Sequence, residues 1–362
     1  MRKIIFFMVF FFCFKSAALT IKEDCLLDLQ KIPYHLLAND AGGKDIFNRK
    51  GKIYFEDSLH YHQSRVSTIT SEQECLDLIG EYLKVWRDGH LYIGPSSKQK
   101  YTTATRKEKL KRLAEIKFIN PNVVYVGLPN FQNYNKEHLK KLLLDNRDQL
   151  LLTKNWIIDV RGNGGGSDSI YYPILPWIIS NETIRVSASW LVTEDNKSAQ
   201  KRICDNNDSA DCDAKVQKIL DSMKGVANGD FASQTKSTGV SFTPPSNHPK
   251  AEKVAVLIDN KCASSCEEFI LLLKQSFNVK TLGQRTAGLL DYSNLRPYQL
   301  PSGKRELWYA TSRSNRLPYF PIDSYGIAPD IYLPFDNAES DKFILVKRVA
   351  NWIEGGSLSP KQ

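Results

Sequence analysis

The chain has 362 residues, of which 42% are hydrophobic and 25% charged, the balance of an ordinary globular protein with room for one large domain and a smaller one. The formal net charge of +9 is modest. The basic stretch from Lys107 to Arg112 is typical of a solvated helix face, and no phosphate-binding glycine loop is evident. Composition therefore argues against a nucleic-acid partner.

The first 18 residues have the features of an export signal. Met1-Arg2-Lys3 is basic, Ile4 to Phe14 is apolar but too short to span a bilayer comfortably, and Ser16-Ala17-Ala18 supplies small residues. We expect residues 1–18 to be a signal peptide cleaved after Ala18, with an uncleaved anchor as the alternative. No other run of 18 apolar residues is present, so we expect no membrane span in the mature chain.

Six cysteines remain once Cys13 is removed with the signal, and an exported protein would form disulfides with them. Six thiols allow 15 pairings, and the sequence leaves the connectivity open. Sequence proximity favours Cys204–Cys212, while Cys262–Cys266 would bracket Ser264 and Cys25–Cys75 would tie the new N-terminus to a helix. Zinc is the alternative for any cysteine pair, but no Cys-x-x-Cys repeat and no histidine at ligand spacing accompanies them. We therefore expect disulfides, no metal and no cofactor.

Hydrophobic periodicity predicts the organisation after the signal. Residues 19–95 are expected to form a mainly helical domain, in which the stretch from Glu72 to Arg87 carries an apolar stripe at helical spacing. Residues 96–122 are expected to be a connector with a helix. A core domain follows over 123–340, interrupted by a polar insertion at 181–250 with one helix near 213–224, and residues 341–362 form a C-terminal helix and tail.

The core domain alternates strands and helices. Strands are predicted at 123–128, 156–160 and 254–258, because these runs are short, apolar and rich in β-branched residues. Helices are predicted at 136–152, 171–179 and 269–274. This alternation predicts an α/β fold with a mostly parallel sheet covered by helices.

Three motifs carry candidate chemistry. Asp88-Gly89-His90 follows the helix that ends near Arg87, and its Asp-Gly turn is expected to expose His90 on a loop. Asp159-Val160-Arg161-Gly162-Asn163-Gly164-Gly165-Gly166 follows a buried strand, where glycines let backbone N–H groups approach a ligand. Cys262-Ala263-Ser264-Ser265-Cys266 links a buried strand to a helix. A serine there can act as a nucleophile beside N–H donors, or it can simply cap the helix.

Taken together, these motifs resemble the C-terminal processing and tricorn-core family of serine peptidases. The resemblance continues in Gly283-Gln284-Arg285-Thr286-Ala287-Gly288 and ends in Asp323-Ser324-Tyr325-Gly326-Ile327-Ala328-Pro329-Asp330. It implies a crotonase-like β/α spiral core and a peptide or protein substrate. It also makes a bacterial periplasmic or secreted location the expected one for the exported chain. No segment resembling a PDZ domain separates His90 from the strand at Val123.

The resemblance also implies a set of site residues. The processing branch uses a lysine base, but Leu289 stands at the equivalent position, which favours the histidine-base branch. Ser264 would be the nucleophile, His90 the general base and Asp323 the group that orients the base. The backbone N–H of Ser265 and one from Gly164 or Gly165 would form the oxyanion hole. Glu267 is expected in the first helical turn, where a carboxylate suits the helix dipole.

The sequence therefore predicts an exported serine peptidase that forms an acyl-enzyme at Ser264. Two alternatives remain open. One is a family member that has lost turnover and acts as a ligand-binding or scaffold protein, and the other is an acyl hydrolase that does not cleave peptides. The sequence does not indicate the oligomeric state.

Overall fold

The computed structural model describes residues 20–97, 111–205, 210–235, 237, 239–246, 250–334 and 339–358. The expected signal peptide lies outside the described residues. Within the described ranges, no helix combines the length and apolar character needed to cross a membrane.

The N-terminal region is helical, as its periodicity predicts. Its helices are α1 (Ile21–Asn39), α2 (Gly43–Lys50), α3 (Lys52–Arg65) and α4 (Glu72–Trp86). Capping boxes at Thr20 and Ser71 fix the first residues of α1 and α4 by satisfying N–H groups that the helix itself leaves unpaired. The apolar faces of the four helices meet in a core that also includes Leu300, Leu307 and Tyr309 from later in the chain.

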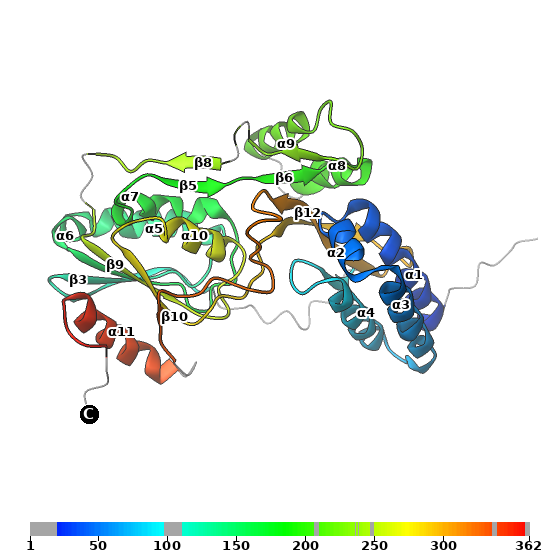
Figure 1. Ribbon diagram of the computed structural model, residues 1–362, viewed down its shortest axis with the longest axis horizontal. Helices are drawn as coiled ribbons and strands as arrows, with labels where there is room; N and C mark the ends of the chain where they lie inside the picture. The colour runs from blue at the N-terminus through cyan, green and yellow to red at the C-terminus, as the bar shows by residue number, and fades with distance from the viewer. Residues whose placement is uncertain are drawn as a thin grey trace, which may run out of the picture.

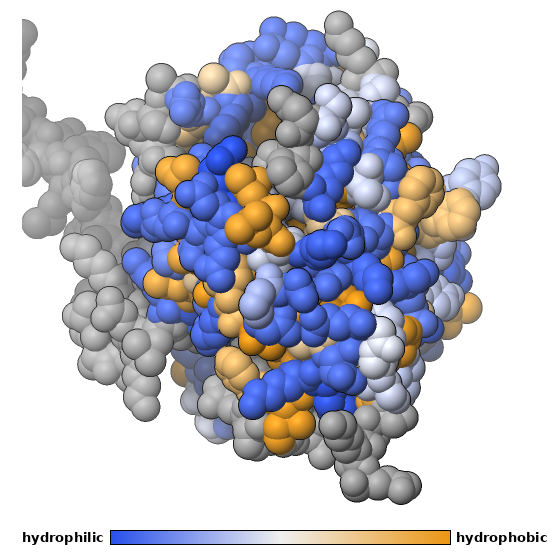
Figure 2. All heavy atoms as spheres, turned by 90° about the vertical axis from the view of Figure 1, so that its left-hand side faces the viewer, coloured by the Kyte–Doolittle hydropathy of each residue, from blue (hydrophilic) through white to orange (hydrophobic). Residues whose placement is uncertain are grey.

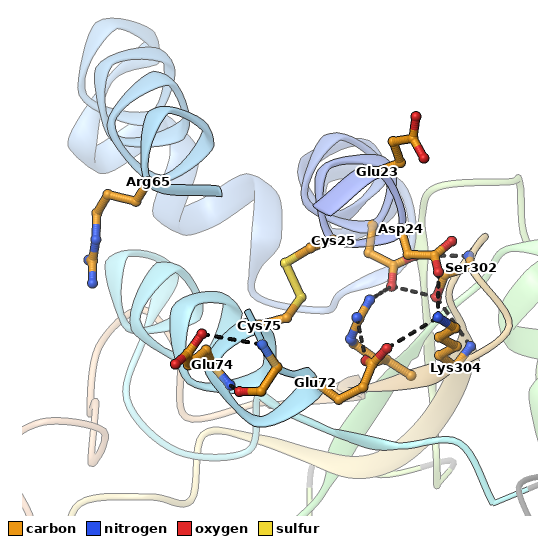
Figure 3. Close-up of a disulfide and its surroundings, with 12 residues drawn as sticks. Glu23, Asp24, Cys25, Arg65, Glu72, Glu74, Cys75, Ser302 and Lys304 are labelled. Atoms are coloured by element: carbon orange, nitrogen blue, oxygen red, sulfur yellow. Dashed lines mark hydrogen bonds and ion pairs between the residues drawn. A yellow bond between two sulfur atoms is a disulfide. The ribbon is translucent and has the colours of Figure 1, made fainter. Parts of the chain in front are cut away.

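A disulfide and a group of ion pairs fasten this helical region. The Cys25–Cys75 bond joins α1 to α4, with Cα atoms 5.9 Å apart (Figure 3). Beside it, Lys304 Nζ lies 2.6 Å from Asp24 Oδ2 and 3.2 Å from Glu72 Oε1. Because Lys304 lies in the turn between two later strands, these pairs tie the helices to the rest of the molecule.

The core contains a six-stranded sheet in the order β13-β10-β9-β4-β3-β2. All neighbouring pairs are parallel except β2–β3. The strands are β2 (Glu115–Asn120), β3 (Val123–Gly127), β4 (Asn155–Asp159), β9 (Lys253–Ile258), β10 (Val279–Gly283) and β13 (Ile331–Tyr332).

Alternating strand residues cover both faces of this sheet. Val124, Ile158 and Val256 pack on one face in a core shared with α5 (Tyr134–Asp145), α6 (Arg147–Leu152), α7 (Leu175–Ile178) and α10 (Ser265–Leu273). Tyr125 and Ile157 pack on the other face against α11 (Glu339–Ile353). Figure 1 shows this layering, with α11 on the opposite side of the sheet from α5, α7 and α10. The α/β fold with a helical N-terminal region is thus confirmed.

A second sheet joins the helical region to the core and to the insertion. It pairs β1 (Tyr92–Pro95), β12 (Arg305–Ser314), β6 (Ala188–Leu191) and β7 (Phe231–Ser233) in that order, with β11 (Tyr292–Gln299) also paired to β12. The insertion at 181–250 supplies β6, β7, α8 (Glu194–Lys201), α9 (Ala210–Ser222) and a separate pair, β5 (Thr183–Val186) with β8 (Gly239–Phe242). In Figure 1, α8 and α9 lie together at the end of β6.

Three details differ from the sequence expectations. The described part of the 96–122 connector contains β2, which belongs to the core sheet, while residues 98–110 lie outside the described residues. The helix expected over 136–152 is divided at Asn146 into α5 and α6. The helix expected over 171–179 is reduced to short pieces, because Pro173 and Pro176 remove N–H donors.

The end of the molecule that carries α6 and α11 is mostly hydrophilic. Its hydrophobic residues lie in small separate groups and not in one continuous area (Figure 2). Scattered apolar residues of this kind are normal on a globular surface.

Candidate active site

Ser264 lies at the turn between β9 and α10 and has a strained backbone. It is the N-cap residue of α10, with φ 58° and ψ −125°, a conformation that residues with a Cβ rarely adopt. The glycine run packs directly against it, since a Cβ on Gly165 would lie 2.9 Å from Ser264 Cβ and 2.7 Å from the Ala263 carbonyl oxygen. A serine held in such a strand-to-helix turn is typical of a catalytic nucleophile.

Glu267 holds this turn in place, a role that its sequence position did not indicate. Its carboxylate is fully buried and accepts hydrogen bonds from the Thr286 hydroxyl (2.6 Å) and from the backbone N–H groups of Gly288 (2.7 Å), Leu289 (2.8 Å) and Ser264 (3.2 Å). Burial raises the pKa of Glu267, and the donated hydrogen bonds oppose that rise. Instead of simply facing the helix dipole, Glu267 joins the nucleophile turn to the loop at 286–289.

His90 follows α4 and has a positive φ of 48°. It is partly buried, where the sequence predicted an exposed loop residue. Burial, together with the charge of Arg87, lowers the pKa of His90 to about 4, although a hydrogen bond with the Tyr292 backbone acts in the opposite direction. The imidazole is therefore neutral at physiological pH, and its Nδ1 atom is buried without a hydrogen-bond partner in the described structure.

Arg87 fixes the turn that carries His90. Its guanidinium pairs with the buried Asp40 carboxylate through both terminal nitrogens, and Nη2 also donates to the His90 carbonyl oxygen at 2.9 Å. Leu289 packs on the same turn, since a Cβ on Gly89 would lie 2.2 Å from Leu289 Cδ2. The Leu289 carbonyl also accepts the Ser264 N–H at 3.0 Å. Leu289 therefore contacts both the histidine turn and the serine turn.

Ser264 and His90 line the same cavity, which has a volume of about 1040 Å³. Ser265 and Gly166 line it as well. The cavity lies among α5, α9, α10, β5 and β11, so its wall includes both the core and the insertion.

Asp323 does not line this cavity, and its hydrogen bonds go to the backbone. Its Oδ1 atom accepts from the N–H groups of Leu290 and Asp291, both at 2.6 Å, while Asp291 Oδ2 accepts from Ile322 and Asp323 at 2.6 and 2.8 Å. Burial and the neighbouring Asp291 charge raise the pKa of Asp323 to about 7. Among the described residues, no hydrogen bond joins Asp323 to His90.

The glycine run offers a different set of donors from the expected one. The N–H of Gly165 donates to Asn163 Oδ1 at 2.9 Å and is therefore already paired. Gly164 is exposed and does not line the cavity. Gly166, which the sequence analysis did not select, is the member of the run that lines the cavity beside Ser264 and Ser265.

The sequence also did not predict the charged residues of the cavity wall. Glu268, Arg316, Asp168 and Arg185 line the cavity and form two ion pairs. Charged residues in a sequence are usually predicted to be solvated. The one signal for buried carboxylates was the pair Glu267-Glu268 in an otherwise apolar helix.

All three expected cysteine pairs lie at bonding distance, with S–S separations of 1.98, 2.01 and 2.06 Å for Cys25–Cys75, Cys204–Cys212 and Cys262–Cys266. The last pair brackets Ser264. In the described part of the chain, no three histidine, cysteine, aspartate or glutamate side chains gather as metal ligands.

The sequence and the fold were compared with those of known proteins. The family model for peptidase family S41 matches residues 122–333. No curated protein resembles the sequence closely enough to match it.

Solved structures share the fold across nearly the whole chain. A putative peptidase from Parabacteroides merdae has a TM-score of 0.58 at 15% identity and covers 93% of this chain and 99% of its own. A mutant of CPAF has a TM-score of 0.64 at 12% identity, with the same coverage of 93% and 99%. A lipoprotein from Streptococcus agalactiae has a TM-score of 0.52 at 16% identity and covers 92% and 97%.

Identities this low show a shared fold and nothing more, but the family match spans more than half of the sequence and includes the serine turn. The chain belongs to peptidase family S41.

Proposed function

We propose that the protein is an exported serine peptidase in which Ser264 forms an acyl-enzyme and His90 is the general base. The observation that carries this proposal is that a strained serine and a neutral, partly buried histidine, from distant parts of the chain, line one cavity. Strained backbone and a strongly shifted pKa cluster at functional sites.

The chemistry is acyl transfer. Ser264 Oγ attacks the peptide carbonyl carbon while its proton passes to the His90 imidazole. The C–N bond then breaks, and His90 returns the proton to the leaving amine. Water then attacks the ester carbonyl carbon while His90 accepts its proton. The bond from that carbon to Ser264 Oγ breaks, His90 returns the proton to Oγ, and the product leaves with its new carboxyl group. Because burial lowers the pKa of His90 to about 4, the imidazole is unprotonated throughout the neutral range, which is the form that a general base requires.

The oxyanion of the tetrahedral intermediate needs N–H donors. We assign one to Ser265, in the first turn of α10, and one to the glycine run, where Gly166 is the better-placed candidate because it lines the cavity and Gly165 is already paired. One such donor typically contributes about 3–4 kcal/mol to transition-state stabilisation.

Asp323 is proposed to orient His90 or to stabilise its charged form. Only Oδ1 of Asp323 makes hydrogen bonds in the described structure, which leaves Oδ2 for a further partner. The buried Nδ1 of His90 in turn lacks one. The alternative is that Asp323 only holds the backbone of Leu290 and Asp291.

Export to a bacterial periplasm or to the medium is part of the proposal. The signal-like residues 1–18 support it, as do the three disulfides, because cysteine pairs persist in oxidising compartments. Fractionation of cells that produce the full chain, followed by N-terminal sequencing, tests both the location and cleavage after Ala18.

Labelling with a fluorophosphonate probe tests the nucleophile. The parent protein should become labelled and Ser264→Ala should not, while Ser198→Ala, at an exposed serine on α8, should label like the parent. Equal labelling of Ser264→Ala would refute the assignment. A parent protein that does not label would favour the binding or scaffold alternative, and hydrolysis of esters but not of peptides would favour a different acyl hydrolase.

A further inference from the structure

The cavity beside Ser264 extends along β11. Leu290 lines it directly after Leu289, whose carbonyl accepts the Ser264 N–H. Ser293, Asn294, Leu295 and Arg296 continue the lining along the strand. At a rise of about 3.3 Å per residue, Arg296 lies at most about 20 Å from Leu290 along the strand. An extended peptide rises at a similar rate, so it would span this distance with about six residues.

Two of the arginines that line the cavity are neutralised by carboxylates. Arg316 Nη2 lies 2.6 and 2.5 Å from the two carboxylate oxygens of Glu268. Arg185 Nη1 lies 3.6 Å from Asp168 Oδ2. In each pair the two charges cancel, so these residues contribute little net charge to the attraction of a ligand.

Three other cations of the lining have no carboxylate partner among the described residues. Arg296 donates only to neutral oxygens, from Nε and Nη2 to Gln200 Oε1 at 2.9 and 2.6 Å and from Nη1 to the Leu295 carbonyl at 2.6 Å. Lys136 on α5 and Lys215 on α9 form no ion pair with any residue that the structure describes. Asp211 on α9 is the remaining anion of the described lining, so positive charge exceeds negative by two.

Arg296 is the strongest indication of an anion site among these cations, because its surroundings disfavour the charged form of its guanidinium. Arg296 is partly buried, which lowers its pKa to about 10, and among the described residues no carboxylate pairs with it to offset that cost. A buried charge is normally paired, since removing it from water without a partner is expensive. A guanidinium with neutral acceptors alone, in the wall of an open cavity, is suited to an anion that arrives with a ligand.

We propose that this cavity holds a subsite for a peptide carboxylate, with Arg296 as its guanidinium and Lys136 and Lys215 as the other cations of the lining that attract the anion, and that it selects substrates with an acidic group within about six residues of the scissile bond. The inference rests on the proposed peptidase function and deepens it by naming the substrate class. The carboxylate can belong to an aspartate or glutamate side chain or to the end of the substrate chain.

Internally quenched decapeptides test the subsite. One series carries a single glutamate at successive positions with an amidated C-terminus, the matched series carries glutamine, and a third carries glutamine with a free C-terminus. We expect kcat/KM for the best glutamate peptide to exceed its glutamine partner about fivefold or more at low ionic strength, and less at high salt because screening weakens exposed charges. A preference only for the free C-terminus would identify the chain end as the source.

Variants locate the effect. Arg296→Gln and the double variant Lys136→Gln/Lys215→Gln should each reduce the glutamate-to-glutamine ratio toward one. The ratio of kcat/KM for the glutamate peptide to that for the glutamine peptide is measured for each variant. A loss of activity that affects both peptides equally therefore does not change it. The double variant Lys140→Gln/Lys218→Gln, on the same two helices but outside the cavity lining, should keep the parental ratio. Equal rates on all three peptide series by the parent enzyme would overturn the subsite and leave the peptidase proposal intact.

A binding measurement keeps the two proposals separable. Fluorescence anisotropy of dye-labelled peptides with Ser264→Ala should give tighter binding for the carboxylate-bearing peptides than for the amidated glutamine peptide. If the parent hydrolyses nothing but this preference holds, the peptidase proposal fails and the subsite stands. Equal affinity for all peptides would refute the subsite even in an inactive protein.

Discussion

The serine turn and the histidine turn are both strained, but different parts of the molecule hold them. Ser264, with φ 58°, is held inside the core by Glu267, which accepts one hydrogen bond from Ser264 and three from the loop at 286–289, and by the Cys262–Cys266 bond. His90, with φ 48°, is held by Arg87, whose partner Asp40 directly follows α1 of the helical region. The two sides of the site therefore have separate anchors, which can be removed one at a time.

Removing the Glu267 carboxylate should have the largest effect. Glu267→Ala leaves three donors, at Thr286, Gly288 and Leu289, without their acceptor, while the Ser264 N–H keeps only its bond to the Leu289 carbonyl. Each unsatisfied buried group costs about 1–3 kcal/mol, so we expect a loss of at least about 3 kcal/mol in the free energy of unfolding, together with loss of probe labelling at Ser264. Urea denaturation and labelling measure the two.

Glu267→Gln is the matched control for this change. It keeps one acceptor oxygen but turns an amide donor toward backbone N–H groups, so it should fall between the parent and Glu267→Ala in both measurements. Parental stability and labelling in Glu267→Ala would show that the carboxylate does not hold the serine turn.

One disulfide fastens the helical region and another brackets the serine turn. Removing each in turn should separate effects on stability from effects on activity. Cys25–Cys75 closes a loop with a sequence separation of 50 and Cys262–Cys266 one of 4. In the chain-entropy model these correspond to about 4 and about 2 kcal/mol of stabilisation. The double variant Cys25→Ala/Cys75→Ala should therefore lose more free energy of unfolding than Cys262→Ala/Cys266→Ala. The double variant Cys262→Ala/Cys266→Ala should lose more of the acylation rate. Unfolding curves and single-turnover acylation rates test this, and a reversed order of activity losses would contradict it.

His90→Ala tests the other side of the site without disturbing the serine turn. Loss of a positioned base should reduce kcat by at least about 100-fold, or about 2.7 kcal/mol in the barrier. The melting temperature should change little, because the ring is only partly buried and its Nδ1 has no partner to lose. His60→Ala, at an exposed histidine on α3, is the control and should behave like the parent. Near-parental kcat in His90→Ala would require a different base.

Asp323→Asn should have the smallest effect on rate and an informative effect on pH dependence. Because the pKa of Asp323 is raised to about 7, its carboxylate is lost as pH falls through neutrality, and activity that depends on it should decline there. With asparagine, the remaining titrating group is His90, whose pKa of about 4 places the acid limb at lower pH. Loss of one orienting interaction should lower kcat on the order of tenfold.

A pH–rate profile of kcat/KM decides between the two roles of Asp323. A parental acid limb and full turnover in Asp323→Asn would mean that the residue only positions the backbone of Leu290 and Asp291. Asparagine keeps an oxygen that can accept from these two N–H groups, so loss of folding does not obscure the result.

Local patterns predicted the parts of the site whose signals lie close together in the chain. The strands at 123–127, 155–159 and 253–258 are short runs rich in β-branched residues, and the turn with Ser264 lies between such a strand and a helix. The Cys204–Cys212 pair followed from proximity in the sequence, and the family followed from motif order. These predictions succeeded because each depends on neighbours within a few residues or on the order of motifs.

Contacts between distant residues decided the rest. The β2 strand was missed for another reason: Ile116 and Phe118 alternate with polar residues and pack on the core, but they lie in a stretch whose overall composition is basic and polar. The choice of Gly166 over Gly164 depends on which glycine borders a cavity that also includes Ser264, 98 residues away in the sequence numbering. The choice between the glycines therefore has no local signature.

The sequence by itself determined the α/β core, the helical N-terminal region, the strand-to-helix turn with its serine, and the family, since these depend on periodicity, propensity and motif order. Only the tertiary structure decided that Glu267 is a buried acceptor, that His90 is partly buried and neutral, and that Arg296 lines the cavity with neutral partners. The physical reason is that burial and electrostatic environment depend on what packs around a side chain, and those neighbours come from segments far apart in the chain.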